Sequence, residues 1–305
     1  MSTAPMTASS SEDLRGPSSR RTPQQFLKSL RGWLPVAPFV LFVGIFLLLP
    51  AVVVFQKALA RVDEVRAPMI EAISGQYRDS FVFSIKLSAI TAVLGVIFGT
   101  MVAASIVRLG HRRGLRNAMT GYSAVAANLG GIPLAFAFLA SLGVQGLVTK
   151  ILKTSGIDIV SHGFRISNFW GIVVVYLYFQ IPLMTLVMLP AIDGLKSTWR
   201  EAAANLGAGD RQYWRFVALP LLLPSLIAGF LLLFANAFAA YATAYALSSG
   251  ASKLVPVQIR FFLQGNTITG KSNLGYALAA WMIIIMTVSM LGFLLLRRRA
   301  ERWRR

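Results

Sequence analysis

The chain alternates between long apolar blocks and shorter polar, mostly basic connections. Each block has about 20 residues, which is the length an α-helix needs to cross a hydrocarbon core of about 30 Å. We therefore predict an all-α, polytopic membrane protein with six transmembrane helices, at residues 34–55, 81–107, 122–142, 169–189, 225–247 and 274–296. In the third block, Gly130, Gly131 and Pro133 interrupt the pattern, which a membrane helix tolerates where neighbouring protein satisfies its backbone.

The same pattern divides the chain into three parts. Residues 1–33 are rich in Ser, Pro, Thr and Arg and read as a mobile cytoplasmic tail. Residues 34–296 form the transmembrane domain, and residues 297–305 form a basic cytoplasmic tail. The first apolar block is too long for a signal peptide and lacks a small-residue cleavage site, so we expect it to be retained.

Lys and Arg residues predict the orientation of the spans. Of the 30, 19 lie in the two tails and in connections 108–118 and 192–220, whereas 10 lie in connections 57–79, 147–168 and 249–273. The basic side of a membrane protein is cytoplasmic, so both termini should be inside. The net charge of +19 thus mainly reflects the orientation of the spans in the membrane. We expect the chain to contact the lipid bilayer and not to bind nucleic acid.

The composition excludes several kinds of site. The chain has no cysteine, and its two histidines, His111 and His162, lie in different connections, so we predict no metal site and no catalytic site. All 11 acidic residues lie outside the predicted spans. A carboxylate proton relay is therefore absent, which weighs against a secondary transporter, the alternative class that we considered.

Connection 192–220 has helical features of its own. Thr198 and Glu201 have the spacing of a capping box, and the alanine-rich run after them favours a helix. Gly207 suits the left-handed position that ends a helix, and Asp210 can cap a second one over residues 211–218. We expect Leu219 and Pro220 to stop that second helix before the fifth span.

These residues resemble a known motif. The run EAAANLGAG at residues 201–209, followed by FVALP at residues 216–220, resembles the EAA loop of ABC-importer inner-membrane permeases. Residues 34–296 resemble these permeases, with a five-helix core plus one N-terminal helix; Asn205 is a departure from the usual residue. The residues of the ATPase-coupling loop implied by the resemblance are Glu201, Ala202, Ala203, Gly207, Leu219 and Pro220.

The resemblance also implies partners. A cytoplasmic ABC ATPase dimer would bind the coupling loop, an extracytoplasmic solute-binding protein would deliver the substrate, and a second permease subunit, a different chain, would complete the pathway. The chain itself would not be an enzyme and would hold no cofactor, because ATP would be used by the partner subunits. The location implied is the bacterial cytoplasmic membrane.

The resemblance is to the spermidine/putrescine-like branch, which implies a polyamine-like substrate, with phosphonate, ferric iron or thiamine as alternatives. Four polar residues inside or beside the predicted spans are candidates for the pathway: Asn128, Gln180, Asn236 and Tyr241. Hydrogen bonding between helices is the structural alternative for each of them.

Residues 265–272 read GNTITGKS and match the P-loop pattern GxxxxGK[ST] in full. A P-loop requires a buried strand before it and a helix of an α/β sheet after it. Here a hydrophobic span follows, on the side predicted to be external. We interpret the segment as a polar turn.

Overall fold

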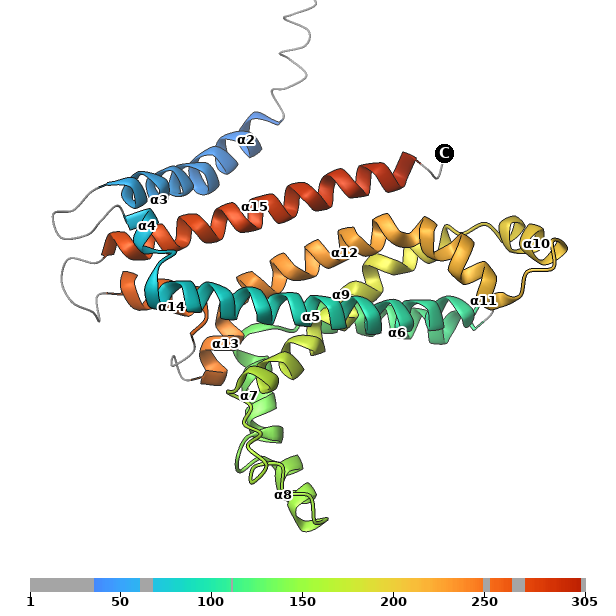
Figure 1. Ribbon diagram of the computed structural model, residues 1–305, viewed down its shortest axis with the longest axis horizontal. Helices are drawn as coiled ribbons and strands as arrows, with labels where there is room; N and C mark the ends of the chain where they lie inside the picture. The colour runs from blue at the N-terminus through green and yellow to red at the C-terminus, as the bar shows by residue number, and fades with distance from the viewer. Residues whose placement is uncertain (1–35, 61–67, 111, 249–252, 265–271, 303–305) are drawn as a thin grey trace, which may run out of the picture. The chain divides into compact units, whose positions relative to one another are not determined.

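The computed structural model describes residues 36–60, 68–110, 112–248, 253–264 and 272–302 (Figure 1). These residues form helices joined by short turns, and no strand occurs among them. Six helical stretches are long and apolar enough to span a membrane, which confirms the predicted number. The elements, in chain order, are α2 (Ala37–Val43), η1 (Gly44–Leu48), α3 (Leu49–Leu59), α4 (Pro68–Glu71), α5 (Gly75–Arg108), α6 (Arg113–Asn128), α7 (Gly131–Leu142), α8 (Leu147–Thr154), α9 (Phe169–Asp193), α10 (Ser197–Asn205), α11 (Asp210–Tyr213), η2 (Trp214–Ala218), α12 (Leu219–Ala239), α13 (Tyr241–Ser248), α14 (Val255–Leu263) and α15 (Ser272–Arg302).

The chain divides into two compact units, at residues 1–52 and 53–305. The described part of the first unit is a single apolar helical stretch from α2 through η1 into α3. The second unit contains the candidate sites described below. The P-loop-like segment lies outside the described residues except for Ser272, which begins α15.

Helix α9 is the centre of the second unit. It packs against α5, α6 and α12, and its side chains are buried around most of its circumference. Gly95 and Gly99, whose GxxxG spacing favours close helix packing, lie where α5 meets its neighbours. A Cβ atom on Gly99 would lie 2.5 Å from Cβ of Met184 on α9, and one on Gly95 would lie 2.6 Å from Cδ2 of Leu233 on α12. A Cβ at Gly99 would also lie 2.8 Å from the backbone carbonyl oxygen of Ile181, so the approach of α5 to α9 requires glycine there, whereas at Gly95 the end of the Leu233 side chain would have to move.

The third and fifth spans are not the single helices that we predicted. The prediction of one helix over residues 122–142 was wrong, because the chain breaks between Asn128 and Gly131, and the apolar stretch instead covers Gly131–Thr154. The prediction for residues 225–247 was wrong as well. Helical structure begins at Asp210 and ends at Ala239, and α13 starts after a break at Ala240.

The sequence Leu219-Pro220 does not stop a helix, contrary to our expectation. α11 continues through the π-helical segment η2 into α12, and the amide of Leu219 bonds to the carbonyl of Trp214 five residues back. A proline lacks an amide donor and its ring crowds the carbonyl four residues back. The wider π turn just before Pro220 relieves that conflict, so the helix passes through it. The segment η1 precedes Leu49-Pro50 in the same way.

Candidate functional site

The connection between α9 and α12 contains two short helices, α10 and α11. The predicted cap of the first is wrong: α10 begins at Ser197 with Lys196 at the N-cap and has no side-chain capping bond. Its start two residues earlier, at Ser197 instead of Trp199, places Thr198 inside the first turn. The second helix begins one residue earlier than predicted, at Asp210, with Gly209 as its N-cap. Gln212 satisfies this end, because its Oε1 accepts a bond of 2.9 Å from the amide of Gly209.

Gly207 ends α10 in the left-handed conformation that the sequence predicts, with φ of +78°. Its amide donates to the carbonyl of Ala204 at 2.9 Å, and the amide of Ala208 donates to Ala203 at 2.9 Å. This pair of bonds is a Schellman motif, which satisfies carbonyls at the end of a helix. No atom lies within 4 Å of a Cβ built on Gly207, so the backbone alone requires glycine there.

An ion pair joins the two helices. Nη2 of Arg200 on α10 donates to Oδ1 of Asp210 at 2.9 Å, and both side chains are exposed. Exposed pairs contribute little on their own, about 0.2–1 kcal/mol. The turn geometry at Gly207 and the cap at Gly209 therefore do most to fix the angle between α10 and α11.

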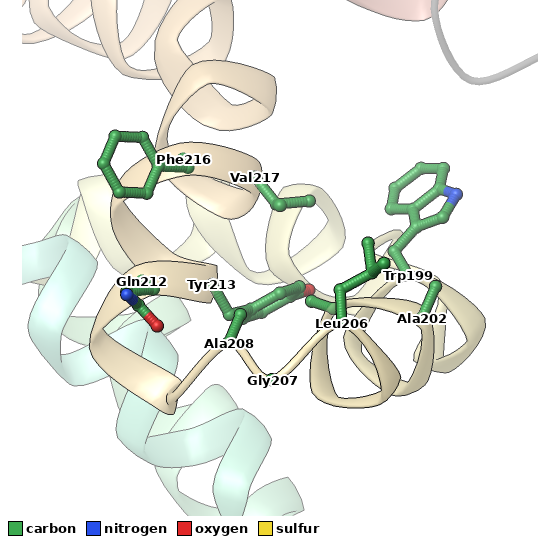
Figure 2. Close-up of a pocket in the computed structure, with 10 residues that line it drawn as sticks. Trp199, Ala202, Leu206, Gly207, Ala208, Gln212, Tyr213, Phe216 and Val217 are labelled. Carbon is green, nitrogen blue, oxygen red and sulfur yellow. The ribbon is translucent and has the colours of Figure 1, made fainter.

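The two helices enclose an apolar groove of about 490 Å³ (Figure 2). Figure 2 shows Tyr213 extending from α11 toward Leu206 at the end of α10. Leu206 is 87% exposed and Phe216 is 68% exposed, although both are large apolar residues. The groove is lined by Trp199, Ala202, Ala203, Leu206, Gly207, Ala208, Gln212, Tyr213, Phe216 and Val217.

The structure brings together only part of the predicted coupling residues. Ala202, Ala203 and Gly207 line the groove. Glu201 is exposed on α10 beside it and forms no ion pair with any described residue. Leu219 and Pro220 lie farther along the continuous helix, outside the groove lining.

Sequence reasoning missed the apolar lining of the groove. Trp199, Leu206, Tyr213, Phe216 and Val217 supply most of its side-chain surface. The sequence signal that could have revealed the groove is the repetition of large apolar residues in an otherwise polar connection. A loop that faces only water gains no stability from such residues.

A second site lies where α6 and α12 end. At the first break, Gly131 has φ of +78°, its amide donates to Oγ1 of Thr243 at 2.8 Å, and the same hydroxyl donates to its carbonyl at 3.3 Å. At the second break, the hydroxyl of Tyr176 donates to the carbonyl of Ala240 at 2.6 Å. Side chains of α9 and α13 thus satisfy backbone groups that the broken helices leave free.

The two breaks line one polar pocket of about 500 Å³. Three of the four predicted pathway residues meet there: Asn128, Asn236 and Tyr241. The fourth, Gln180, is fully buried elsewhere and donates to Oγ1 of Thr91 at 2.8 Å. The breaks place the three residues together, although they come from segments more than 100 residues apart.

A cation lies beside this pocket. Arg260 of α14 donates to the hydroxyl of Tyr241, and its guanidinium carbon lies 4.2 Å from the centre of the Tyr245 ring. The bond to Tyr241 raises the pKa of Arg260 above its ordinary value, so the group stays charged. No described carboxylate pairs with it.

Comparison with known proteins assigns the chain to a family. The family model described as "Binding-protein-dependent transport system inner membrane component" matches residues 95–305. The chain belongs to this family. It is the permease subunit of an ABC importer, a multi-pass inner-membrane protein and not an enzyme.

Similar proteins differ in what their names say they transport. The permease is 27% identical over 218 residues to the molybdenum transport system permease protein ModB of Mycobacterium tuberculosis, which covers 70% of the chain and 77% of that protein. It is 26% identical over 204 residues to the spermidine/putrescine transport system permease protein PotC of Haemophilus influenzae, covering 67% and 70%.

Solved structures show the same fold. A chain of the bacterial alginate ABC transporter, in complex with an alginate pentasaccharide-bound periplasmic protein, matches with a TM-score of 0.66 at 17% identity. The match covers 94% of the permease and 99% of that chain. The predicted permease fold is thereby confirmed.

Proposed function

We propose that the groove between α10 and α11 is the docking site for a cytoplasmic ABC ATPase, whose closure on ATP moves the permease. The observation that carries this proposal is the exposure of Leu206 and Phe216 on a rigid helical protrusion. Apolar surface held out of the protein by a defined turn suits a partner that buries it. The free carboxylate of Glu201 beside the groove could receive a charge-assisted bond from that partner.

The second part of the proposal concerns the substrate pathway. Asn128 and Asn236 are both exposed, in the last turn of α6 and in the last turn of the apolar helix α12. Polar side chains are costly against lipid, so another protein surface or water must cover this face. A second permease subunit, a different chain, would provide that surface, and the polar pocket would then lie on the path between the two subunits. An extracytoplasmic binding protein would deliver the substrate.

For the substrate, the predicted polyamine-like molecule has one line of support from the site. The amide and phenol oxygens of Asn128, Asn236 and Tyr241 can accept bonds from ammonium groups. Arg260 beside Tyr241 favours a second candidate, an oxyanion, because a guanidinium repels a polycation. The ligand held by the partner binding protein decides between them: a polyamine supports the first candidate and an oxyanion the second.

Docking in the groove is tested by the substitution Leu206→Gln. The side chain is almost fully exposed, so its replacement should leave the permease folded. If the ATPase buries it, losing about 1.5–3 kcal/mol of apolar burial should weaken association about tenfold or more. The measurement is the affinity of the purified permease in detergent for its own ATPase subunit. The matched control is Leu115→Gln, an exposed leucine on α6. Equal affinity in both variants would contradict the proposal.

A further inference from the structure

A separate cavity of about 650 Å³ lies at the base of the α10–α11 protrusion. Its lining includes Arg108 at the end of α5, Leu195 just after α9, and Asp210 at the start of the helix that leads into α12. Three apolar stretches long enough to cross the membrane begin or end at Arg108, Asp193 and Asp210. The cavity therefore lies where these three stretches begin or end, on the side of the unit that holds the protrusion.

Positive charge converges on this cavity. Arg108, Lys196, Arg200 and Arg211 line it, against one carboxylate, that of Asp210. Arg200 forms an ion pair with Asp210, and none of the other three basic residues pairs with a described carboxylate. Lys196 lies with its Nζ 5.8 Å from the centre of the Trp199 ring. Arg108 of α5 and Arg211 of α11, from two separate parts of the fold, therefore line the cavity without a described ion pair.

The rest of the lining has the character of a membrane interface. Val107 and Leu195 are among the aliphatic residues that line it, and Trp214 contributes an indole ring. Tryptophan is enriched at the boundary between headgroups and hydrocarbon, because its ring is apolar and its N–H is polar. A ligand that fits must carry negative charge at one end and tolerate apolar surface at the other.

We propose that this cavity binds the phosphate headgroup of an anionic phospholipid from the adjacent membrane leaflet. Arginine pairs with phosphate through two parallel N–H bonds, and basic residues at a membrane surface attract anionic lipids. A bound headgroup would connect the end of α5 to the base of the protrusion. The lipid would then stabilise the position of the proposed ATPase groove, although its binding does not require the ATPase.

The test is equilibrium binding of radiolabelled dioctanoyl phosphatidylglycerol to the purified full-length permease in a neutral detergent. The variant is Arg108→Gln with Arg211→Gln, which removes two unpaired cations from the cavity. Each basic residue near anionic lipid contributes about 1 kcal/mol, so affinity should fall about thirty-fold. The matched control is Arg112→Gln with Arg113→Gln, which removes the same charge from residues near α5 that do not line the cavity. The control should bind as the native protein does.

A third variant separates charge from folding. Arg108→Lys with Arg211→Lys keeps both charges and should retain most of the binding, and thermal unfolding confirms that each variant is folded. Three results would overturn the proposal: equal loss in the cavity and control variants, equal affinity for dioctanoyl phosphatidylcholine, or displacement of the lipid by inorganic phosphate at similar concentration. The last result would assign the cavity to a soluble anion.

Discussion

At the scale of single residues, backbone conformation at Gly207 determines more of the geometry of the proposed docking groove than side-chain contact does. Gly207 touches nothing where a Cβ would be, yet its φ of +78° sets the direction in which the chain leaves α10. For a residue with a Cβ, the left-handed region costs roughly 1–2 kcal/mol, and asparagine is the usual exception. Substitutions at Gly207 can therefore show whether glycine is required there for its backbone conformation or for its small volume.

The prediction that follows concerns two substitutions at this glycine. Gly207→Val should abolish uptake while membrane insertion stays normal, because a β-branched residue would leave the left-handed region and turn α11 away from α10. Gly207→Asn should keep most of the transport. The measurement is substrate uptake in cells, with the amount of permease in the membrane as reference. If valine and asparagine reduced uptake equally, side-chain volume rather than φ would be the requirement.

At the scale of elements, the interruptions in the helices bring together three of the residues proposed for the substrate pathway. α6 and α12 both end at a break, and the polar pocket lies between those ends. Asn236 lines it from the last turn of α12, whereas Gln180 lies inside the packed part of α9. Two amide side chains on neighbouring helices therefore have different surroundings.

We accordingly expect different results from replacing each amide by leucine. Asn236→Leu should reduce uptake strongly while the subunit still assembles, because the pocket loses a hydrogen-bonding group on the proposed pathway. Gln180→Leu should retain uptake, since Thr91 keeps its bond to the carbonyl of Leu87 at 2.9 Å. Uptake and co-purification of the ATPase are measured for both. Failure of Asn236→Leu to assemble would assign the residue to helix packing instead.

The sequence predicts the number of spans and the left-handed glycine, because apolar length and glycine chemistry are local properties. It does not predict the breaks at Leu129 and Ala240, because hydrogen bonds with the side chains of Thr243 and Tyr176, distant in the chain, stabilise them. The prediction at Pro220 was wrong because a proline normally ends a helix. Here a π turn precedes Pro220, and the helix continues through it. The groove was not predicted because its lining residues come from separate helices, and the sequence alone does not give the angle between those helices.

At the scale of the whole molecule, the distribution of Lys and Arg predicts the side of the membrane on which the protrusion lies. The bias of Lys and Arg over all the connections sets the orientation, so orientation is a property of the entire chain. The proposed docking site and the proposed lipid cavity both belong to the side with more basic residues. The proposed roles of both therefore agree with a cytoplasmic location.

Orientation is tested with single cysteines, which the native chain lacks. Ser161 lies in the connection before α9 and Ser197 begins α10, and both are exposed. An impermeant thiol reagent added to intact cells should label Ser161→Cys and not Ser197→Cys, and permeabilised cells should show labelling of both. The reverse pattern would place the protrusion outside and exclude docking of a cytoplasmic ATPase.

The bonds between Gly131 and Thr243 also bear on how the pocket changes shape. One hydroxyl serves both the amide and the carbonyl at the start of α7, so α13 cannot shift by itself without freeing two backbone groups of the other helix. The two breaks are thus coupled, so that a shift of α13 favours a change at the start of α7 as well. In membrane proteins, hydrogen bonds between helices contribute only about 0.6 kcal/mol each on average, so this coupling biases the two breaks toward moving together and is weak enough to be broken when the pocket changes shape.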